Sequence, residues 1–139
     1  MKEKVLRVLL VDDDNDALTK YKDMFERRGF KVSLAYSVSE AMCYLYNKME
    51  LGIHYAAVMS DFDLENPQDG SGLKLLEAMR KDTAFRDTFF ILYTARTIKE
   101  EGIARIIAAD KRATHFLKPK DMNKVIIPFI LGELECTLR

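Results

Sequence analysis

Five polar residues stand at the ends of four short apolar runs of this sequence, and their side chains suit the chemistry of phosphate and metal ions. They are Asp12, Asp13, Asp61, Thr94 and Lys118. Charged side chains normally avoid the ends of buried segments unless they are paired or bind an ion. Clustered carboxylates repel one another, and a hard divalent cation such as Mg²⁺ relieves that repulsion. Lys118 adds a point charge for a phosphoryl oxygen, so the set favours a Mg²⁺-dependent phosphate site.

Five strands and five helices are predicted to position these residues. Short aliphatic, aromatic or β-branched runs predict strands at 5–11, 30–34, 55–60, 89–93 and 115–117. Apolar residues at helical spacing predict helices at 15–28, 41–49, 73–79, 98–107 and 125–138. Gly29 is expected to end the first helix, and Ser37 or Ser39 to cap the second. Helix capping also explains one of the three consecutive aspartates, such as Asp14, but not all three.

Alternation of strands and helices predicts an α/β fold. It implies a parallel sheet of five strands with helices on both faces. Right-handed crossovers make this a doubly wound fold. Ligands of such folds bind outside the carboxyl ends of the strands, where all five polar residues are expected to converge.

The composition describes a chain that can bury a core and carries no net charge. Of its 139 residues 48% are hydrophobic and 32% are charged, with 22 basic and 22 acidic side chains. This balance argues against electrostatic binding to nucleic acid or to an anionic membrane. The length fits one domain, so residues 1–139 are predicted to form a single domain without an attached output domain.

Targeting signals are not evident in the sequence. The start, Met1-Lys2-Glu3-Lys4, is charged, and the sequence has no apolar run long enough for a membrane span. Cys43 and Cys136 lack the spacing of a metal site, and free thiols in a reducing compartment are the simpler interpretation. A cytoplasmic protein is therefore expected.

Four motifs in their order resemble the receiver domain of two-component response regulators, single-domain chemotaxis regulators among them. Each motif alone is weak, but they occur together at successive strand ends, and the resemblance spans nearly the whole chain. It implies a flavodoxin-like fold with the strand order 2-1-3-4-5. The motifs are Val11-Asp12-Asp13, Ser60-Asp61, Thr94-Ala95 and Lys118-Pro119.

The resemblance implies a signalling domain rather than an enzyme, although one that catalyses its own phosphorylation and dephosphorylation. A sensor histidine kinase or a histidine phosphotransfer protein would be the phosphoryl donor in a two-component system or phosphorelay. The roles that the family assigns fall on Asp12 and Asp13 for Mg²⁺, Asp61 as phosphoacceptor, the backbone carbonyl of Asp63 as a further metal ligand, and Thr94 and Lys118 for the phosphoryl oxygens.

Switching in this family involves the hydroxyl after the fourth strand and a side chain three residues before the lysine. These positions hold Thr94 and His115 here. Once the phosphoryl group attracts the Thr94 hydroxyl, the surface around the last two strands and helices would repack. His115 stands where the family often has an aromatic residue, and we expect its side chain to be half-buried. His54 is expected to be a surface residue.

The sequence departs from the family pattern in several places. The loop from Asp61 to Gly72 is longer than usual, and Glu65 stands where a proline is common. Asp63 and Arg96 are candidates for modulating the lifetime of the phosphoryl group, but a solvated acidic loop and an exposed arginine remain open alternatives. Pro128 falls inside the last helical pattern and predicts that this helix starts late, with the proline in its first turn, or bends.

A phosphatase of the haloacid dehalogenase type is the alternative function. Asp61-Phe62-Asp63-Leu64 has the two carboxylates of its nucleophile motif at the correct spacing. In that family, however, the motif follows the first strand and the acidic metal-binding pair comes last. Here the acidic pair comes first, and the chain has little room for a cap. A binding module that is never phosphorylated has less support, because no expected residue of the site is missing.

Overall fold

The computed structural model describes residues 5–62, 64, 71–95 and 101–138. Strands and helices alternate along this part of the chain, as the sequence predicts. In chain order the elements are β1 (Leu6–Val11), α1 (Asn15–Arg27), β2 (Phe30–Ala35), α2 (Val38–Glu50), β3 (Ala57–Ser60), α3 (Ser71–Lys81), the 3₁₀ turn η1 (Thr83–Phe85), β4 (Phe89–Thr94), α4 (Glu101–Ala109), β5 (Ala113–Leu117), the π-helical segment η2 (Met122–Ile126) and α5 (Ile127–Leu138).

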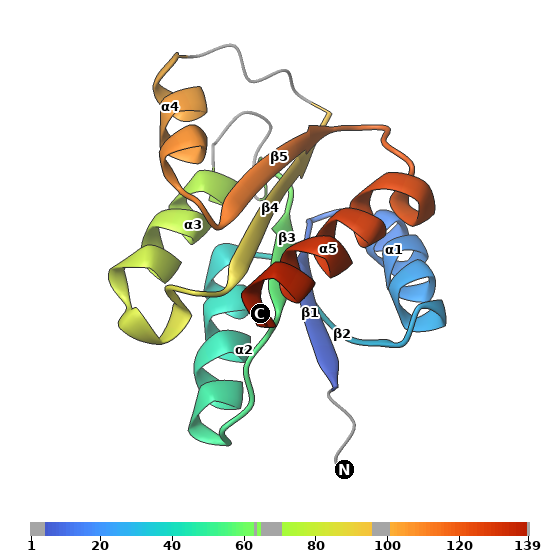
Figure 1. Ribbon diagram of the computed structural model, residues 1–139, viewed down its shortest axis with the longest axis horizontal. Helices are drawn as coiled ribbons and strands as arrows, with labels where there is room; N and C mark the ends of the chain where they lie inside the picture. The colour runs from blue at the N-terminus through green and yellow to red at the C-terminus, as the bar shows by residue number, and fades with distance from the viewer. Residues whose placement is uncertain (1–4, 63, 65–70, 96–100, 139) are drawn as a thin grey trace.

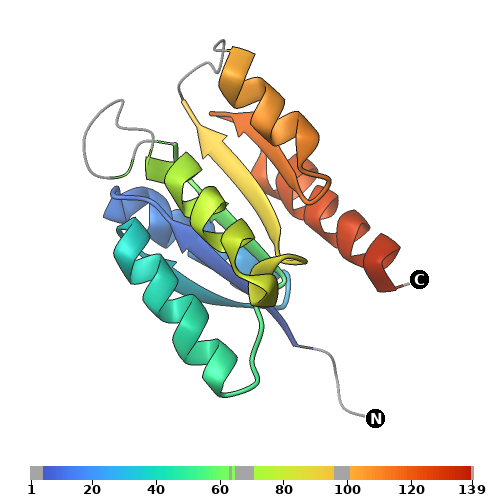
Figure 2. The same ribbon diagram turned by 90° about the vertical axis from the view of Figure 1, so that its left-hand side faces the viewer.

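The five strands form one sheet in the order β2-β1-β3-β4-β5, which confirms the predicted topology. Every neighbouring pair is parallel, so all five carboxyl ends lie at one edge. In Figure 1 that edge is at the top of the sheet, and Figure 2 shows α2, α3 and α4 in front of the strands with α5 behind them. The doubly wound arrangement therefore puts the ends of β1, β3, β4 and β5 together.

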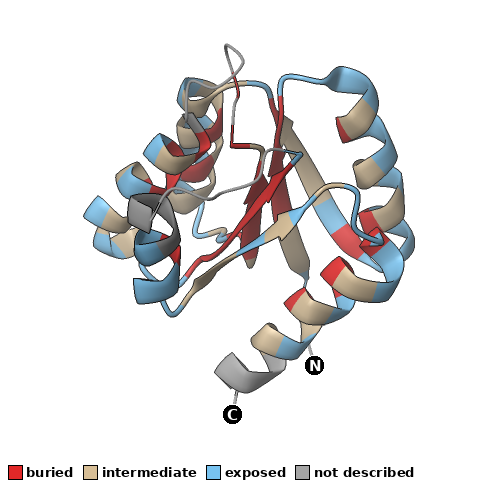
Figure 3. Ribbon diagram, turned by 90° about the horizontal axis from the view of Figure 1, so that it is seen from above, coloured by how far each residue is buried: buried red, intermediate tan, exposed pale blue. Residues whose placement is uncertain are grey.

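Each face of the sheet has its own hydrophobic core, because successive strand residues point to opposite faces. On one face Leu9 and Phe90 pack in a cluster with residues of α2, α3 and α4. On the other, Leu10 and Ile91 pack with residues of α1, η2 and α5. The inner strands β3 and β4 are buried along their whole length and appear as solid red ribbons between the two helical layers in Figure 3.

Local capping explains where the first two helices begin. The Asp14 carboxylate accepts hydrogen bonds from the backbone N–H groups of Asp16 and Ala17, so it is the predicted cap of α1. The Ser37 hydroxyl accepts from the N–H of Glu40, which identifies Ser37 rather than Ser39 as the cap of α2. Capping thus assigns the third aspartate to the fold and leaves Asp12 and Asp13 for the site.

Pro128 lies in the first turn of α5, which begins only at Ile127, as predicted. A π-helical segment precedes it, and this segment was not predicted from the sequence. The Asp121 carboxylate caps the segment by accepting a hydrogen bond of 2.8 Å from the Lys124 N–H. The last helical region therefore begins three residues earlier than predicted, because a wider helical turn accommodates residues ahead of the proline.

The predicted strand ends needed small corrections. The third strand begins at Ala57 instead of residue 55, and the fifth begins at Ala113 instead of residue 115. His54 is exposed, as predicted, and so is Cys43, whose thiol is free. None of the helices in the described part of the chain combines the length and apolarity that crossing a bilayer requires.

Candidate functional site

Backbone hydrogen bonds extend the sheet by one residue at two of its inner strands and so fix the first two groups of the site. The N–H of Asp12 donates to the carbonyl of Ala35 over 3.1 Å, and the N–H of Asp61 donates to the carbonyl of Val11 over 3.0 Å. Both aspartates are thereby held in strand-like positions just beyond β1 and β3. Their side chains are therefore positioned by the hydrogen-bonded sheet.

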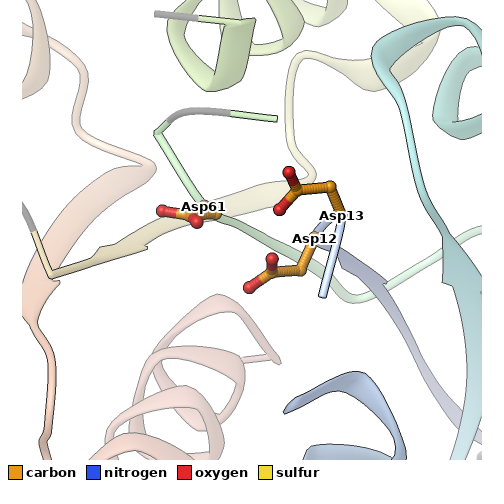
Figure 4. Close-up of side chains that lie close together, drawn as sticks. All are labelled: Asp12, Asp13 and Asp61. Atoms are coloured by element: carbon orange, nitrogen blue, oxygen red, sulfur yellow. The ribbon is translucent and has the colours of Figure 1, made fainter. Parts of the chain in front are cut away.

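Three carboxylates meet at this edge of the sheet (Figure 4). One carboxylate oxygen from each of Asp12, Asp13 and Asp61 lies within 4.8 Å of the other two. Asp12 is buried, with 4% of its surface exposed, whereas Asp13 is exposed and Asp61 is intermediate. The carboxylates therefore form a cluster that is closed toward the sheet and open toward solvent.

Lys118 places its ammonium group beside two of these carboxylates. Its Nζ lies 3.0 Å from Oδ2 of Asp12 and 3.8 Å from Oδ2 of Asp61. The peptide bond from Lys118 to Pro119 is cis. Because Lys118 retains only 20% of its side-chain exposure, its ammonium is held inside the cluster and partly offsets the negative charge.

Asp61 also receives hydrogen bonds from its neighbours. The backbone N–H of Phe62 donates to Oδ1 over 2.8 Å, and the buried hydroxyl of Thr94 hydrogen-bonds the same side chain. Burial raises the pKa of Asp61 above its ordinary value, and the Asp12 carboxylate adds to this effect. Lys118, Phe62 and Thr94 oppose the rise. Asp61 is therefore an acceptor surrounded by donors but short of positive charge.

Two further pKa shifts describe the charge balance of the cluster. Partial burial raises the pKa of Asp13, and a hydrogen bond and the charge of Asp12 raise it further. Burial lowers the pKa of Lys118, but the Asp12 and Asp61 carboxylates outweigh burial and hold it above its ordinary value. One ammonium group does not neutralise three carboxylates, so the cluster favours an additional cation.

Mg²⁺ fits this donor set. Hard divalent cations prefer carboxylate, carbonyl and water oxygens, and Mg²⁺ usually keeps several waters while it is bound through one or two carboxylates. The oxygens of Asp12, Asp13 and Asp61 are mutually close enough for one ion, and the exposed side of Asp13 leaves room for water. Burial raises the pKa values of Asp13 and Asp61, and the negative charge of Asp12 raises both further, so a cation at this edge would offset the repulsion from Asp12.

The structure brings together five of the residues that were singled out in the sequence. Asp12, Asp13, Asp61, Thr94 and Lys118 converge at the carboxyl edge of the sheet, which confirms the predicted clustering. Asp63 and Arg96 lie outside the described residues, together with Glu65.

His115 is exposed, so the prediction of a half-buried side chain is wrong. β5 is an edge strand, and its successive residues point to opposite faces of the sheet. Phe116 points toward α5 and meets the ring of Phe129 at 5.5 Å, whereas Ala113 packs against the cluster that contains Ile107 of α4. His115 is on the same face as Ala113 but nearer the carboxyl end of the strand, and no described helix residue covers it enough to bury it.

Sequence reasoning missed Gly72 as a residue of the site. Gly72 is buried at the start of α3, and its N–H donates to the carbonyl of Phe62 over 2.8 Å. A Cβ at this position would collide with the carbonyl oxygen of Asp61 and would lie 2.9 Å from Cα of Phe62. The sequence signal was the glycine itself, which was interpreted only as part of a polar loop.

Tyr21 and Tyr93 were also missed, because nothing in the sequence pattern singles them out as residues near the site. Tyr21 belongs to α1 and Tyr93 to β4. Both pack in the core on one face of the sheet, but their rings also flank Lys118. Tyrosine at helical or strand spacing gives no sign of which side chain its ring will contact. Only the fold brings these two rings to the lysine.

Comparison with known proteins identifies a family for this arrangement. The sequence model for the response regulator receiver domain matches residues 8–127. The photosynthetic apparatus regulatory protein RegA of Rhodobacter capsulatus is 36% identical over 123 residues, which cover 85% of this chain and 58% of RegA. RegA of Cereibacter sphaeroides is 35% identical over 120 residues with the same coverage. The chain thus spans about 58% of the length of these curated relatives.

A solved structure with the same fold is the CheY-like receiver domain protein from Methanospirillum hungatei JF-1. It aligns with a TM-score of 0.76 and 23% identity over 95% of each chain. That identity is low, so this likeness shows the shared fold. A haloacid dehalogenase type of phosphatase is not supported, because the family that matches is the receiver family and the acidic pair follows the first strand.

Proposed function

The chain belongs to the response regulator receiver domain family of two-component signalling, and on this premise we propose that Asp61 is its phosphoacceptor. The observation that carries the proposal is the position of the Asp61 carboxylate. It follows β3 at the carboxyl edge of the sheet. The Lys118 ammonium lies 3.8 Å away, and the Thr94 hydroxyl is hydrogen-bonded to the carboxylate. A nucleophile, a cation and a hydroxyl donor therefore surround one point at which a phosphoryl group can sit.

The donor is a phosphohistidine of a sensor histidine kinase or of a histidine phosphotransfer protein. A carboxylate oxygen of Asp61 forms a bond to phosphorus while the phosphorus–nitrogen bond breaks, and the electron pair returns to the imidazole of the donor. Asp61 then carries an acyl phosphate. Lys118 offsets charge on the phosphoryl oxygens, and Thr94 donates a hydrogen bond to one of them. Hydrolysis of the acyl phosphate by water returns the carboxylate and inorganic phosphate.

Mg²⁺ is the proposed cofactor, held by Asp12, Asp13, Asp61 and the backbone carbonyl of Asp63. When bound, it supplies positive charge to the phosphoryl oxygens as they leave the donor. Support comes from the mutual distances of the three carboxylates and from their charge, which Lys118 alone does not balance. The assignment of Asp63 rests on the resemblance to the family.

The output is proposed to be a change of the surface around the last two strands and helices. Thr94 ends β4 and is 2% exposed, so any movement of its hydroxyl must displace packed neighbours. His115 is exposed on β5 and is the proposed second element of this switch. Asp63 and Arg96 are proposed to set the lifetime of the phosphoryl group.

We further propose that the protein acts in the cytoplasm through protein partners, without direct contact with nucleic acid or membrane. The net charge of zero supports the absence of electrostatic binding to nucleic acid and membrane. The domain catalyses its own phosphorylation and dephosphorylation, and it is a signalling protein rather than an enzyme with a separate substrate.

Labelling by acetyl phosphate tests the proposal. The wild type is expected to incorporate close to one phosphoryl group per chain in the presence of Mg²⁺ and far less in the presence of a chelator. Asp61→Asn is expected to incorporate none. Equal labelling of the two proteins would refute the assignment of Asp61. Sustained turnover of a phosphomonoester would instead favour the phosphatase.

A further inference from the structure

Lys118 lies against two tyrosine rings. We propose that Tyr93 is a positioning residue for Lys118 and that the ring of Tyr21 supports the lysine from a second side. The ring of Tyr93 and its hydroxyl together hold the lysine in the orientation that receives a phosphoryl group. This inference rests on the proposed function of Asp61, but it assigns a role to residues that never touch the phosphoryl group.

Cation–π contact is the first observation. The Nζ of Lys118 lies 5.4 Å from the centroid of the Tyr93 ring and 6.0 Å from that of Tyr21. The two rings meet edge to face with their centroids 5.7 Å apart, so they support each other. Ammonium groups within about 6 Å of an aromatic face are attracted by its quadrupole. The rings therefore favour a position of the ammonium beside both of them.

The hydroxyl of Tyr93 gives the second observation. It donates a hydrogen bond of 3.0 Å to the carbonyl of Lys120 and accepts one of 3.0 Å from the N–H of the same residue. The N–H of Lys118 in turn donates to the carbonyl of Thr94 over 2.7 Å. Consecutive residues of β4 thus anchor the chain on both sides of Pro119, which fixes the backbone from which the lysine side chain extends.

Burial explains why a tyrosine hydroxyl at this place is informative. Tyr93 is only 4% exposed, and a buried hydroxyl is costly unless it is hydrogen-bonded. Phenylalanine would fill most of the same space without that cost. Both hydrogen bonds of the hydroxyl go to the segment that carries Lys118. The Tyr93 hydroxyl therefore stabilises the segment that carries Lys118 rather than the core in general.

Pre-organisation is the expected benefit. A lysine has a flexible four-carbon stem and many rotamers, so an unsupported ammonium would spend much of its time away from the carboxylates. With the rings and the fixed backbone in place, Lys118 is already 3.8 Å from Asp61 before any donor binds. Phosphoryl transfer then requires no change of the lysine rotamer, and a positioned group accelerates the reaction.

Three variants and one matched control test the inference. Tyr93→Leu removes ring and hydroxyl, Tyr93→Phe removes only the two hydrogen bonds to Lys120, and Tyr21→Leu removes the second ring. Tyr55→Phe is the control. Tyr55 is 5% exposed, and its hydroxyl donates to Ser33 over 2.8 Å at the opposite end of the sheet. The control loses a comparable buried hydrogen bond without touching the site.

Initial rates of labelling by acetyl phosphate with Mg²⁺ are the first measurement. Tyr93→Leu is expected to be slower by roughly three- to tenfold, which is the rate equivalent of losing a partly buried cation–π contact. Tyr93→Phe and Tyr21→Leu are expected to fall between Tyr93→Leu and the wild type. Tyr55→Phe is expected to label at the wild-type rate. Thermal unfolding checks that each variant is folded at the assay temperature.

The second measurement reports the lysine directly. Proton NMR shifts of the Lys118 ε-methylene group are moved by the ring currents of Tyr93 and Tyr21. This displacement should shrink in Tyr93→Leu, be largely restored in Tyr93→Phe, and stay unchanged in Tyr55→Phe. A general loss of stability would not produce that order.

Failure of the inference and failure of the proposed function are distinguishable. A folded Tyr93→Leu protein that labels at the wild-type rate would overturn the positioning role while leaving Asp61 as the acceptor. If Tyr93→Leu does not fold, an unchanged labelling rate in Tyr21→Leu has the same force. Absence of labelling in the wild type would instead contradict the proposed function, and the NMR shifts would still decide whether the rings hold the lysine.

Discussion

A methyl group at Gly72 is expected to separate α3 from the end of β3. The Cβ of alanine at this position would collide with the carbonyl oxygen of Asp61, and it would lie 2.9 Å from Cα of Phe62 and 3.0 Å from the carbonyl carbon of Asp61. Carbon atoms in good contact are about 3.5–4.0 Å apart, so relief requires a shift of roughly 1 Å. All three neighbours are backbone atoms, which cannot turn away as a side chain can.

The shift has consequences for stability and for chemistry. Forcing extra volume into a packed site typically costs about 1–3 kcal/mol, and the hydrogen bond from the Gly72 N–H to the Phe62 carbonyl would lengthen as well. Because the displaced backbone carries Asp61, its carboxylate moves relative to Lys118. A misplacement of about 1 Å can slow a reaction by roughly a hundredfold. Gly72→Ala is therefore expected to unfold at lower urea concentration and to label far more slowly with acetyl phosphate.

Gly132 in α5 supplies the matched control. A Cβ added there meets nothing within 4 Å. Gly132→Ala is expected to stabilise the protein by about 1 kcal/mol through helix propensity and to leave labelling unchanged. If Gly72→Ala unfolds and labels like the wild type, the close approach of α3 to Asp61 plays no part in positioning the acceptor, and the reasoning is refuted.

Three further predictions concern charge. Mg²⁺ at ten times its dissociation constant should raise the free energy of unfolding by about 1.4 kcal/mol. Urea titrations measure this gain, which should be much smaller in Asp12→Asn. In metal-free buffer, Asp61→Asn should be more stable than the wild type at neutral pH. Burial raises the pKa of Asp61, so the folded wild type loses stability as the pH rises from the ordinary value of 3.8 through the raised one. Thermal unfolding should show the stability difference between Asp61→Asn and the wild type growing as the pH rises across this range. A difference that stays constant with pH would contradict the prediction. Arg80→Met should lower the free energy of unfolding by roughly 3 kcal/mol, because Arg80 pairs with Asp110 at 2.7 Å and donates to the carbonyls of Phe85, Thr88 and Arg112. Denaturation in urea measures the loss, and labelling of folded Arg80→Met should stay at the wild-type rate because its contacts are remote from Asp61.

Strand ends were the most predictable part of the site. Apolar runs that stop at a charged residue fix both the end of a buried strand and the edge at which that residue lies. Parallel topology then brings Asp12, Asp61 and Lys118 together, although 106 residues separate the first from the last. The clustering needed only the order of strands and helices, and that order is encoded locally in hydrophobic periodicity.

Contacts that depend on tertiary packing were not predictable in the same way. His115 fits a half-buried strand position by pattern, but its exposure depends on how far α4 extends over β5. Tyr93 and Tyr21 fit any apolar face, and only the assembled fold directs their rings to Lys118. Gly72 becomes important only because α3 crosses the carbonyl of Asp61 closely. In each case the deciding neighbour comes from a distant part of the sequence.

Chemical trapping of the acyl phosphate tests the central claim most directly. Protein phosphorylated with acetyl phosphate and Mg²⁺ is reduced with borohydride, which converts an aspartyl phosphate to homoserine, and the modified peptide is identified by mass spectrometry. We predict homoserine at position 61 and at no other aspartate, with none in Asp61→Asn. Homoserine at another aspartate, or labelled protein without homoserine at position 61, would contradict the account.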